Sequence, residues 1–379
     1  MHNFISLVSL FMLSSLFMSS CSKPEDRGPV VNENGVLENP SSGLWQDQAQ
    51  FPVEIEEVGT LDLSAIEELV ITSATSLSFD EVGNLYFYDR NLTKIISLDQ
   101  EGKLRWAVGQ EGKGPGDFEN PFGMVLYNNK LYIANIQGTR LDEFDLEGNF
   151  IRSTDLAQDL RFASLSGVRN DGLFVFTTAK FGTIGTEIVT LRVPEKDSIE
   201  VVSRFDVIET TDEKYKNASS RGSVVITGDE IWYSHSVNHQ HKVYDYNGNL
   251  LRSITRDFDG ALGPGVYQEG GSISIFTLGR LGPVTFLEDG SYLIRTRYPL
   301  NIDDPNEYAK KASTGSTDPL EYKVVMDLYN ANGELLYVED DTEMLESYGS
   351  LSRIGPDGYY YSVFPDELLI KKYRVNLSR

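Results

Sequence analysis

The stretch Val82-Gly83-Asn84-Leu85-Tyr86 decides the fold, because its pattern returns along most of the chain. In each copy a turn with Gly, Asn or Asp leads into a short strand rich in aromatic residues. Five further copies occupy residues 128–132 (NNKLY), 170–174 (NDGLF), 228–232 (GDEIW), 288–292 (EDGSY) and 356–360 (PDGYY). Measured at Leu85, Leu131, Leu173, Ile231, Tyr292 and Tyr359, the copies are 46, 42, 58, 61 and 67 residues apart. Repeats of this length are typical of β-propeller blades.

A second turn ends in Gly and follows four of the copies, at residues 99–102 (DQEG), 145–148 (DLEG), 245–248 (DYNG) and 330–333 (NANG). Gly at the last position supplies the left-handed backbone that lets two strands fold back as a hairpin. Each copy then provides four strands, which is one blade. The sequence therefore predicts an all-β fold over residues 51–379, a six-bladed β-propeller of four-stranded antiparallel blades.

The last copy is one strand short. Residues 369–375 supply its third strand, and only four residues follow. Residues 51–61 (FPVEIEEVGTL) stand alone before the first copy and alternate like an outer strand. We expect this N-terminal strand to complete the sixth blade, which would close the ring and remove two exposed sheet edges.

The N-terminus has the features of an exported protein. Residues 1–20 contain no Asp, Glu, Lys or Arg and are largely apolar, which predicts a secretory signal peptide. They lead to Cys21, the only cysteine, and resemble a bacterial lipoprotein signal, which implies that Cys21 is the lipidated first residue. An ordinary cleaved signal or a short membrane anchor is the alternative. Residues 21–50 are polar and lack periodicity, which predicts a flexible tether.

Charge and composition limit the partners. The chain has 33 Lys and Arg against 57 Asp and Glu, a net charge of −24. It lacks the basic surplus expected of a protein that binds nucleic acid, so we expect no nucleic-acid partner and membrane contact through the lipid anchor only. With 40% apolar residues the chain can form a core without disulfides, and we expect a monomer.

The second copy carries a family likeness. It contains residues 112–118 (GKGPGDF) with Pro121 and Gly123, then 131–135 (LYIAN), Arg140 and 144–148 (FDLEG). These residues resemble the repeat of NHL-type, TolB-like six-bladed β-propellers. The acidic residues 22–26 resemble the export signals of some Bacteroidetes-type lipoproteins. Together these resemblances imply an outer-membrane-anchored lipoprotein that faces the periplasm or the cell surface.

The glycines of residues 112–124 could also belong to a phosphate-binding loop. Such a loop needs a following helix whose N-terminus faces the anion. Pro121 and the strand expected after it exclude that helix, so we interpret the stretch as the crossing between two blades. We expect Phe118 to pack between those blades.

Three of the four histidines gather in residues 235–241, the loop that joins the middle strands of the fourth blade. His235 and His241 could approach each other across this hairpin and bind a divalent metal. The alternative is a local structural role, because His239 falls where the similar family repeats often carry His or Thr. We expect no other cofactor.

Equivalent loops of the other blades carry polar and basic side chains. If they converge, they form a mouth for an anionic or hydroxyl-rich ligand. The alternative is that Arg140 and Lys94 are repeat residues that pair with neighbouring blades. Residues 301–320 form an insertion in the fifth copy, which we expect to be a mobile surface loop. The candidate ligand-binding residues are Asp89, Arg90, Asn135, Arg140, Lys180, His235, His239, Arg295 and Arg297.

No catalytic nucleophile is evident, because the chain has no Gly-x-Ser-x-Gly motif and no cysteine besides Cys21. We therefore expect a binding or interaction module whose loop-rich face contacts an envelope protein, a peptide or a glycan. The alternative is a metal-dependent propeller enzyme similar to lactonases or amidating lyases. A third hypothesis is a structural spacer in an envelope complex.

Overall fold

The computed structural model describes residues 28–378, except for residue 49 and residues 136–138, 157–159, 161–162, 180–185, 195–198, 208–221, 236–238, 259–264, 271, 277 and 318. The predicted signal peptide and Cys21 therefore lie outside the described residues.

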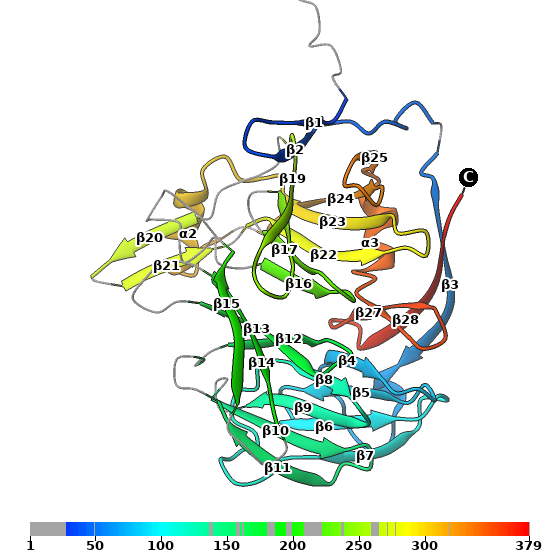
Figure 1. Ribbon diagram of the computed structural model, residues 1–379, viewed down its shortest axis with the longest axis vertical. Helices are drawn as coiled ribbons and strands as arrows, with labels where there is room; N and C mark the ends of the chain where they lie inside the picture. Colours follow the sequence, from blue (N-terminus) through cyan, green and yellow to red (C-terminus); the bar gives the residue numbers. More distant parts are fainter. Residues whose placement is uncertain are drawn as a thin grey trace, which may run out of the picture.

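Six blades form a ring, and in each of them the first-named strand is the innermost (Figure 1). Blade one contains β4 (Thr75–Phe79), β5 (Leu85–Asp89), β6 (Lys94–Leu98) and β7 (Leu104–Val108). Blade two contains β8 (Met124–Tyr127), β9 (Lys130–Asn135), β10 (Arg140–Asp145) and β11 (Phe150–Asp155). Blade three contains β12 (Ser164–Val168), β13 (Leu173–Ala179), β14 (Thr186–Arg192) and β15 (Glu200–Asp206).

The second half of the ring has the same plan. Blade four contains β16 (Gly222–Ile226), β17 (Ile231–His235), β18 (Gln240–Tyr244) and β19 (Leu250–Arg256). Blade five contains β22 (Arg280–Phe286), β23 (Tyr292–Pro299), β24 (Tyr322–Tyr329) and β25 (Leu335–Glu339). Blade six contains β26 (Arg353–Ile354), β27 (Tyr360–Phe364), β28 (Leu369–Leu377) and the N-terminal strand β3 (Val53–Asp62). The predicted six-bladed propeller is confirmed.

The ring closes as the sequence predicts. Strand β3 pairs antiparallel with β28, so that Ile55 lies opposite Val375, and Figure 1 shows the two strands side by side. Val53 and Val375 are buried in the core between blades five and six. One strand from the start of the propeller thus completes the blade that the end of the chain leaves one strand short.

The core lies between the blades. Residues of β5 are buried without alternation, because each middle strand packs against a neighbouring blade on both faces. The crossing over residues 112–124 shows how two blades are joined. The Phe118 ring is fully buried, with its centroid 5.6 Å from those of Tyr88 in blade one and Phe144 in blade two. Strand β8 follows this crossing, so the structural interpretation of the glycines is confirmed.

The expected tether is not free over its C-terminal part. Strand β2 (Val36–Asn39), which follows the short β1 (Val30–Val31), runs parallel to β19 and extends blade four. The Asn39 side chain is buried and donates to the carbonyl oxygens of Thr255 and Gly333. Further along, the Trp45 backbone N–H donates to the Leu336 carbonyl at 2.7 Å. Residues 36–48 are therefore part of the propeller surface, and the prediction of a flexible segment is wrong for them.

Two elements depart from the regular repeat. A hairpin of β20 (Gly265–Glu269) and β21 (Ser272–Phe276) lies between blades four and five. Helix α2 (Pro305–Ser313) occupies the insertion that we expected to be a mobile loop, and that expectation is wrong. Hairpin and helix lie together at one side of the ring, where the Asn306 side chain accepts from the Val266 backbone N–H at 3.0 Å (Figure 1).

The remaining helical elements are short. The 3-10 helix η1 spans Leu63–Ala65, and α3 (Thr342–Tyr348) lies between blades five and six. Every helix in the described part of the chain is too short or too polar to span a bilayer.

Candidate functional site

Asp89, which we expected at a binding mouth, instead organises its own loop. The side chain is fully buried and its carboxylate accepts hydrogen bonds from the backbone N–H groups of Thr72 and Leu92, at 2.7 and 3.1 Å. Burial alone would raise the pKa of this carboxyl, but these hydrogen bonds outweigh it and lower the pKa below its ordinary value. The neighbouring Arg90 is exposed. Asp89 is therefore a structural residue.

Asn135 and Arg140 stabilise the crossing between blades one and two through hydrogen bonds. The Arg140 guanidinium donates to the carbonyls of Lys113, Gly114 and Asp117 at 2.8 to 3.2 Å, and it pairs with Asp142. The Asn135 amide donates to the Asp117 carbonyl at 2.7 Å and to Asp142 at 2.6 Å. Both side chains are buried. This arrangement agrees with the alternative in which Arg140 is a repeat residue.

The proposed metal pair does not form. In the register of β17 and β18, Ser234 lies opposite His241, and His235 lies opposite Gln240. Because neighbouring residues of a strand point to opposite faces, His235 and His241 lie on different faces of blade four. Across the described residues, no group of three or more His, Cys, Asp and Glu side chains could hold a metal ion. Lys180 lies outside the described residues.

His239 and His241 belong instead to a buried polar cluster between blades four and five. The Nε2 atom of His239 lies 3.1 Å from the Thr296 hydroxyl, and the Nδ1 atom of His241 lies 3.1 Å from the Ser234 hydroxyl. Arg256 donates to Asp327 within the same cluster. Burial lowers the pKa of both histidines to about 3, and Arg256 adds to this effect at His239. The histidines are neutral residues of the core.

Arg295 and Arg297 face the boundary between blades five and six. The Arg297 guanidinium lies 3.8 Å from the Tyr322 ring centroid and 3.9 Å from the Glu346 carboxylate of α3. Burial, and then the neighbouring Arg297, lower the pKa of Arg295. Both side chains lie outside the pocket that we describe next, as do the other predicted ligand residues in the described part.

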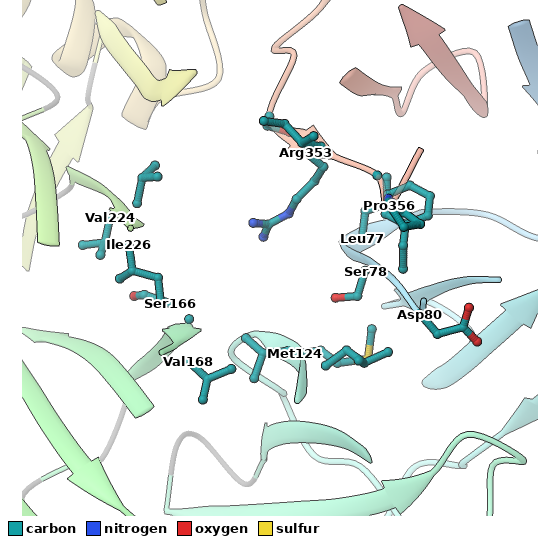
Figure 2. Close-up of a pocket in the computed structure, with 18 of the residues that line it drawn as sticks. Leu77, Ser78, Asp80, Met124, Ser166, Val168, Val224, Ile226, Arg353 and Pro356 are labelled. Carbon is teal, nitrogen blue, oxygen red and sulfur yellow. The ribbon is translucent and has the colours of Figure 1, made fainter. Parts of the chain in front are cut away.

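The central channel of the propeller contains a cavity of about 480 Å³. It is lined by residues from the innermost strands of all six blades, β4, β8, β12, β16, β22 and β26, and by the turns that follow two of them. Figure 2 shows these side chains arranged around an open centre. The cavity lies within the range of small-molecule sites, which are commonly 300 to 1,000 Å³, roughly, and mostly apolar.

Most of the residues that line the channel are apolar, although polar atoms make up the larger part of the surface exposed to it. Leu77 and Met124 come from blades one and two, and Val168 and Val224 come from blades three and four. The Ser78 hydroxyl points into the cavity (Figure 2). The second serine of the wall, Ser166, is already engaged, because its hydroxyl lies 2.8 Å from that of Thr177. The channel thus offers both apolar and polar surface to a ligand.

Arg353 of β26 projects its guanidinium towards the middle of this cavity (Figure 2). The side chain is accessible to the water of the channel, yet protein surrounds it. The loss of bulk solvent lowers the pKa of the guanidinium, and no described charge or hydrogen bond contributes to that shift. Asp80, also on the wall, accepts from the Tyr86 hydroxyl at 2.8 Å and points away from the centre (Figure 2). Arg353 is thus a cation without an acidic partner among the described residues.

The sequence contains one signal for the position of Arg353 in the propeller. The innermost strand of each blade precedes its turn, and Arg353 stands just before the sixth turn at residues 356–360. It pairs with Tyr361 as Ser78 pairs with Tyr86 in blade one. A comparison of the residues before each turn places Arg353 on the innermost strand, but it does not tell which way the side chain faces.

Several solved structures share this fold. A member of the DUF4221 family from Bacteroides vulgatus has 12% identity and a TM-score of 0.55, covering 86% of this chain and 99% of its own. A putative exported protein from Bacteroides fragilis has 11% identity and a TM-score of 0.52, covering 89% and 99%. A streptogramin B lyase has 12% identity and a TM-score of 0.45, covering 86% and 98%. At these identities the likeness to the first two structures shows the fold alone, and nothing is argued from the third.

No curated protein matches the chain. A family model described as a 6-bladed beta-propeller, DUF5128, matches residues 54–262. This match covers 262 − 54 + 1 = 209 of the 379 residues, which is more than half of the chain. The chain therefore belongs to the DUF5128 family of six-bladed β-propellers.

Proposed function

We propose that this protein is a lipid-anchored propeller of the cell envelope that binds a small ligand in its central channel. The observation that carries the proposal is the cavity of about 480 Å³ to which all six blades contribute. A concave pocket that combines apolar side chains with a few polar groups is the usual form of a ligand site. The channel replaces the loop-rich face as the candidate site, because Asp89, Asn135 and Arg140 of that face are engaged in holding loops together.

The envelope location rests on the N-terminal sequence. The apolar residues 1–20 and Cys21 resemble a lipoprotein signal, and the likeness of the second repeat to NHL-type and TolB-like propellers fits an exported protein. Replacement of Cys21 by Ser should abolish incorporation of radiolabelled palmitate in the native host. Equal labelling of the two proteins would refute the lipid anchor.

Binding is better supported than metal-dependent catalysis. A metal enzyme of the lactonase or amidating-lyase kind needs several ligands that converge on one ion. His235 and His241, the residues expected to start such a site, lie on opposite faces of blade four. Arg353, by contrast, already points into an open cavity.

A neutral fluorescent probe tests the channel. N-phenyl-1-naphthylamine becomes brighter in apolar surroundings and is small enough for the cavity. We expect the wild-type protein to bind it, and Ser78→Trp, which fills the channel, to bind it at least about tenfold more weakly. The control Val82→Trp places the same ring on an exposed turn and should bind like the wild type. Equal binding by all three proteins would refute a channel site.

A further inference from the structure

We propose that the ligand of the central channel is an organic anion, with one carboxylate or similar group bound by Arg353 and an apolar body held by the channel wall. This inference rests on the proposed function and adds the chemical class of the ligand. It follows from three features of the channel: the charge of Arg353, which no acid pairs, the Ser78 hydroxyl beside it, and the apolar side chains among the lining residues.

Among the described arginines that protein largely surrounds, Arg353 shares the lack of an ion pair with Arg295, whose Nε atom is buried without a hydrogen bond, and differs from the others. The buried Arg256 is paired with Asp327, Arg140 with Asp142, and the part-buried Arg252 with Glu230 at 2.6 Å. These pairs follow the general rule that a charge removed from bulk water has a partner. With a net charge of −24 the chain has an excess of acidic residues, yet none of the described ones forms an ion pair with the Arg353 guanidinium.

Two acids line the cavity, Asp80 and Glu81, and neither forms an ion pair with Arg353. Besides the Tyr86 hydroxyl, the Asp80 carboxylate accepts from the Asn84 amide at 2.7 Å and from the Asn84 backbone N–H at 2.8 Å. Asp80 therefore closes the turn between β4 and β5. Its neighbour Glu81 is exposed on the same turn. The five N–H donors of Arg353 stay available to an anion from outside the chain.

The Ser78 hydroxyl and the apolar lining residues indicate the remaining chemistry of the ligand. Ser78 and Arg353 lie on the innermost strands of neighbouring blades, β4 and β26, and Figure 2 shows both side chains directed into the same space. A hydroxyl next to a guanidinium can donate a second hydrogen bond to a carboxylate. Leu77, Met124 and Val224 line the same cavity and can contact an apolar body, which a free inorganic ion lacks.

A matched pair of probes separates the charge from the apolar body. The probe 8-anilinonaphthalene-1-sulfonate carries one anionic group on the aromatic body of N-phenyl-1-naphthylamine. Both probes are titrated into the wild type, Arg353→Met, Arg353→Lys and the control Arg90→Met, which removes an exposed arginine outside the channel. Urea unfolding of each protein verifies that it is folded.

We expect Arg353→Met to weaken binding of the anionic probe by about 10- to 100-fold, the usual effect of losing a charge-assisted hydrogen bond. The neutral probe should bind this variant as it binds the wild type. Arg353→Lys should keep part of the affinity for the anion, and Arg90→Met should keep all of it. Equal binding of the anionic probe by Arg353→Met and Arg90→Met would overturn the inference. If neither probe responds to Ser78→Trp, it is the proposed channel function that fails.

Discussion

The Nε2 atom of His239 lies 3.6 Å from the carboxylate of Asp327, across the boundary between blades four and five. Arg256 donates to the same carboxylate, and the Tyr329 hydroxyl lies 3.3 Å from it. All of these side chains are buried or nearly so. One carboxylate thus links two blades, and its charge compensates that of a buried arginine.

Asp327→Asn should therefore destabilise the protein strongly. The substitution leaves the Arg256 charge buried without a partner, which typically costs about 3–5 kcal/mol. The free energy of unfolding in urea at pH 7 measures the loss. The control Asp340→Asn removes the carboxylate that pairs with Lys323 at 2.6 Å, but it is exposed, and the expected loss is below about 1 kcal/mol. Similar losses in the two variants would contradict the structural role of the cluster.

Acid should destabilise the propeller through His239 and His241. Their pKa values are about 3 in the folded protein and near the ordinary 6.5 in the unfolded chain. Between these values the unfolded state binds more protons, so the free energy of unfolding falls as the pH is lowered from 6.5 towards 3. Two such groups give a slope of up to about 2.7 kcal/mol per pH unit.

The carboxyl groups limit the pH range in which this slope can be measured. Burial raises the pKa of Asp327, which works in the opposite direction and reduces the slope. Acids such as Asp89 have a lowered pKa and begin to lose their contribution only below their ordinary value of 3.8. Urea unfolding between about pH 6 and 4.5 therefore avoids most of the contribution of the acids whose pKa is lowered. Replacement of both by Asn should flatten the profile, and a flat wild-type profile would count against the neutral histidine pair.

Arg140→Gln should destabilise the crossing between blades one and two. The shorter neutral side chain loses the ion pair with Asp142 and the hydrogen bonds to the carbonyls of Lys113 and Gly114. Since Asp142 is fully buried, we expect a loss of about 3 kcal/mol or more in the free energy of unfolding. The exposed Arg90→Gln is the control, with a change of at most about 0.5 kcal/mol. A stable Arg140→Gln variant would reopen a ligand-binding role for Arg140.

Asn39→Ala should release the N-terminal segment without unfolding the ring. The Asn39 side chain donates to Thr255 and Gly333 and accepts from the Leu335 backbone N–H at 2.8 Å, so it fastens β2 to blades four and five. Its removal leaves buried backbone groups unsatisfied, at about 1–3 kcal/mol in total. Limited proteolysis should then cleave before residue 50 much faster than in the wild type. Unchanged cleavage would show that β2 is held by other contacts.

The sequence was sufficient to predict the ring, because the residue types of its turns identify them as hairpin turns. Turns such as residues 145–148 end in a Gly with positive φ, which at Gly148 is +85°, and this marks hairpins at a regular spacing. The missing last strand then required β3. Strand β2 was missed because a four-residue strand in parallel pairing has no hairpin signal. Helix α2 could have been predicted from the sequence. Asp304 is its N-cap, Pro305 is its first residue, and Lys310 and Lys311 lie in its last turn.

The site was harder to predict than the fold. Polar residues at strand ends, such as Asp89 and Arg140, were expected to face a ligand, but their hydrogen bonds go to backbone groups of neighbouring segments. Whether Arg353 faces the channel depends on the register of β26, a strand of two residues, and a shift by one residue would turn the side chain away. Composition carries no information about that register.

The most direct measurement is a crystal structure of the protein grown with 8-anilinonaphthalene-1-sulfonate. The account predicts one ordered probe inside the central channel, with its sulfonate within hydrogen-bond distance of the Arg353 guanidinium and its rings against Leu77 and Met124. A probe bound only on the outer surface, with water alone around Arg353, would contradict it.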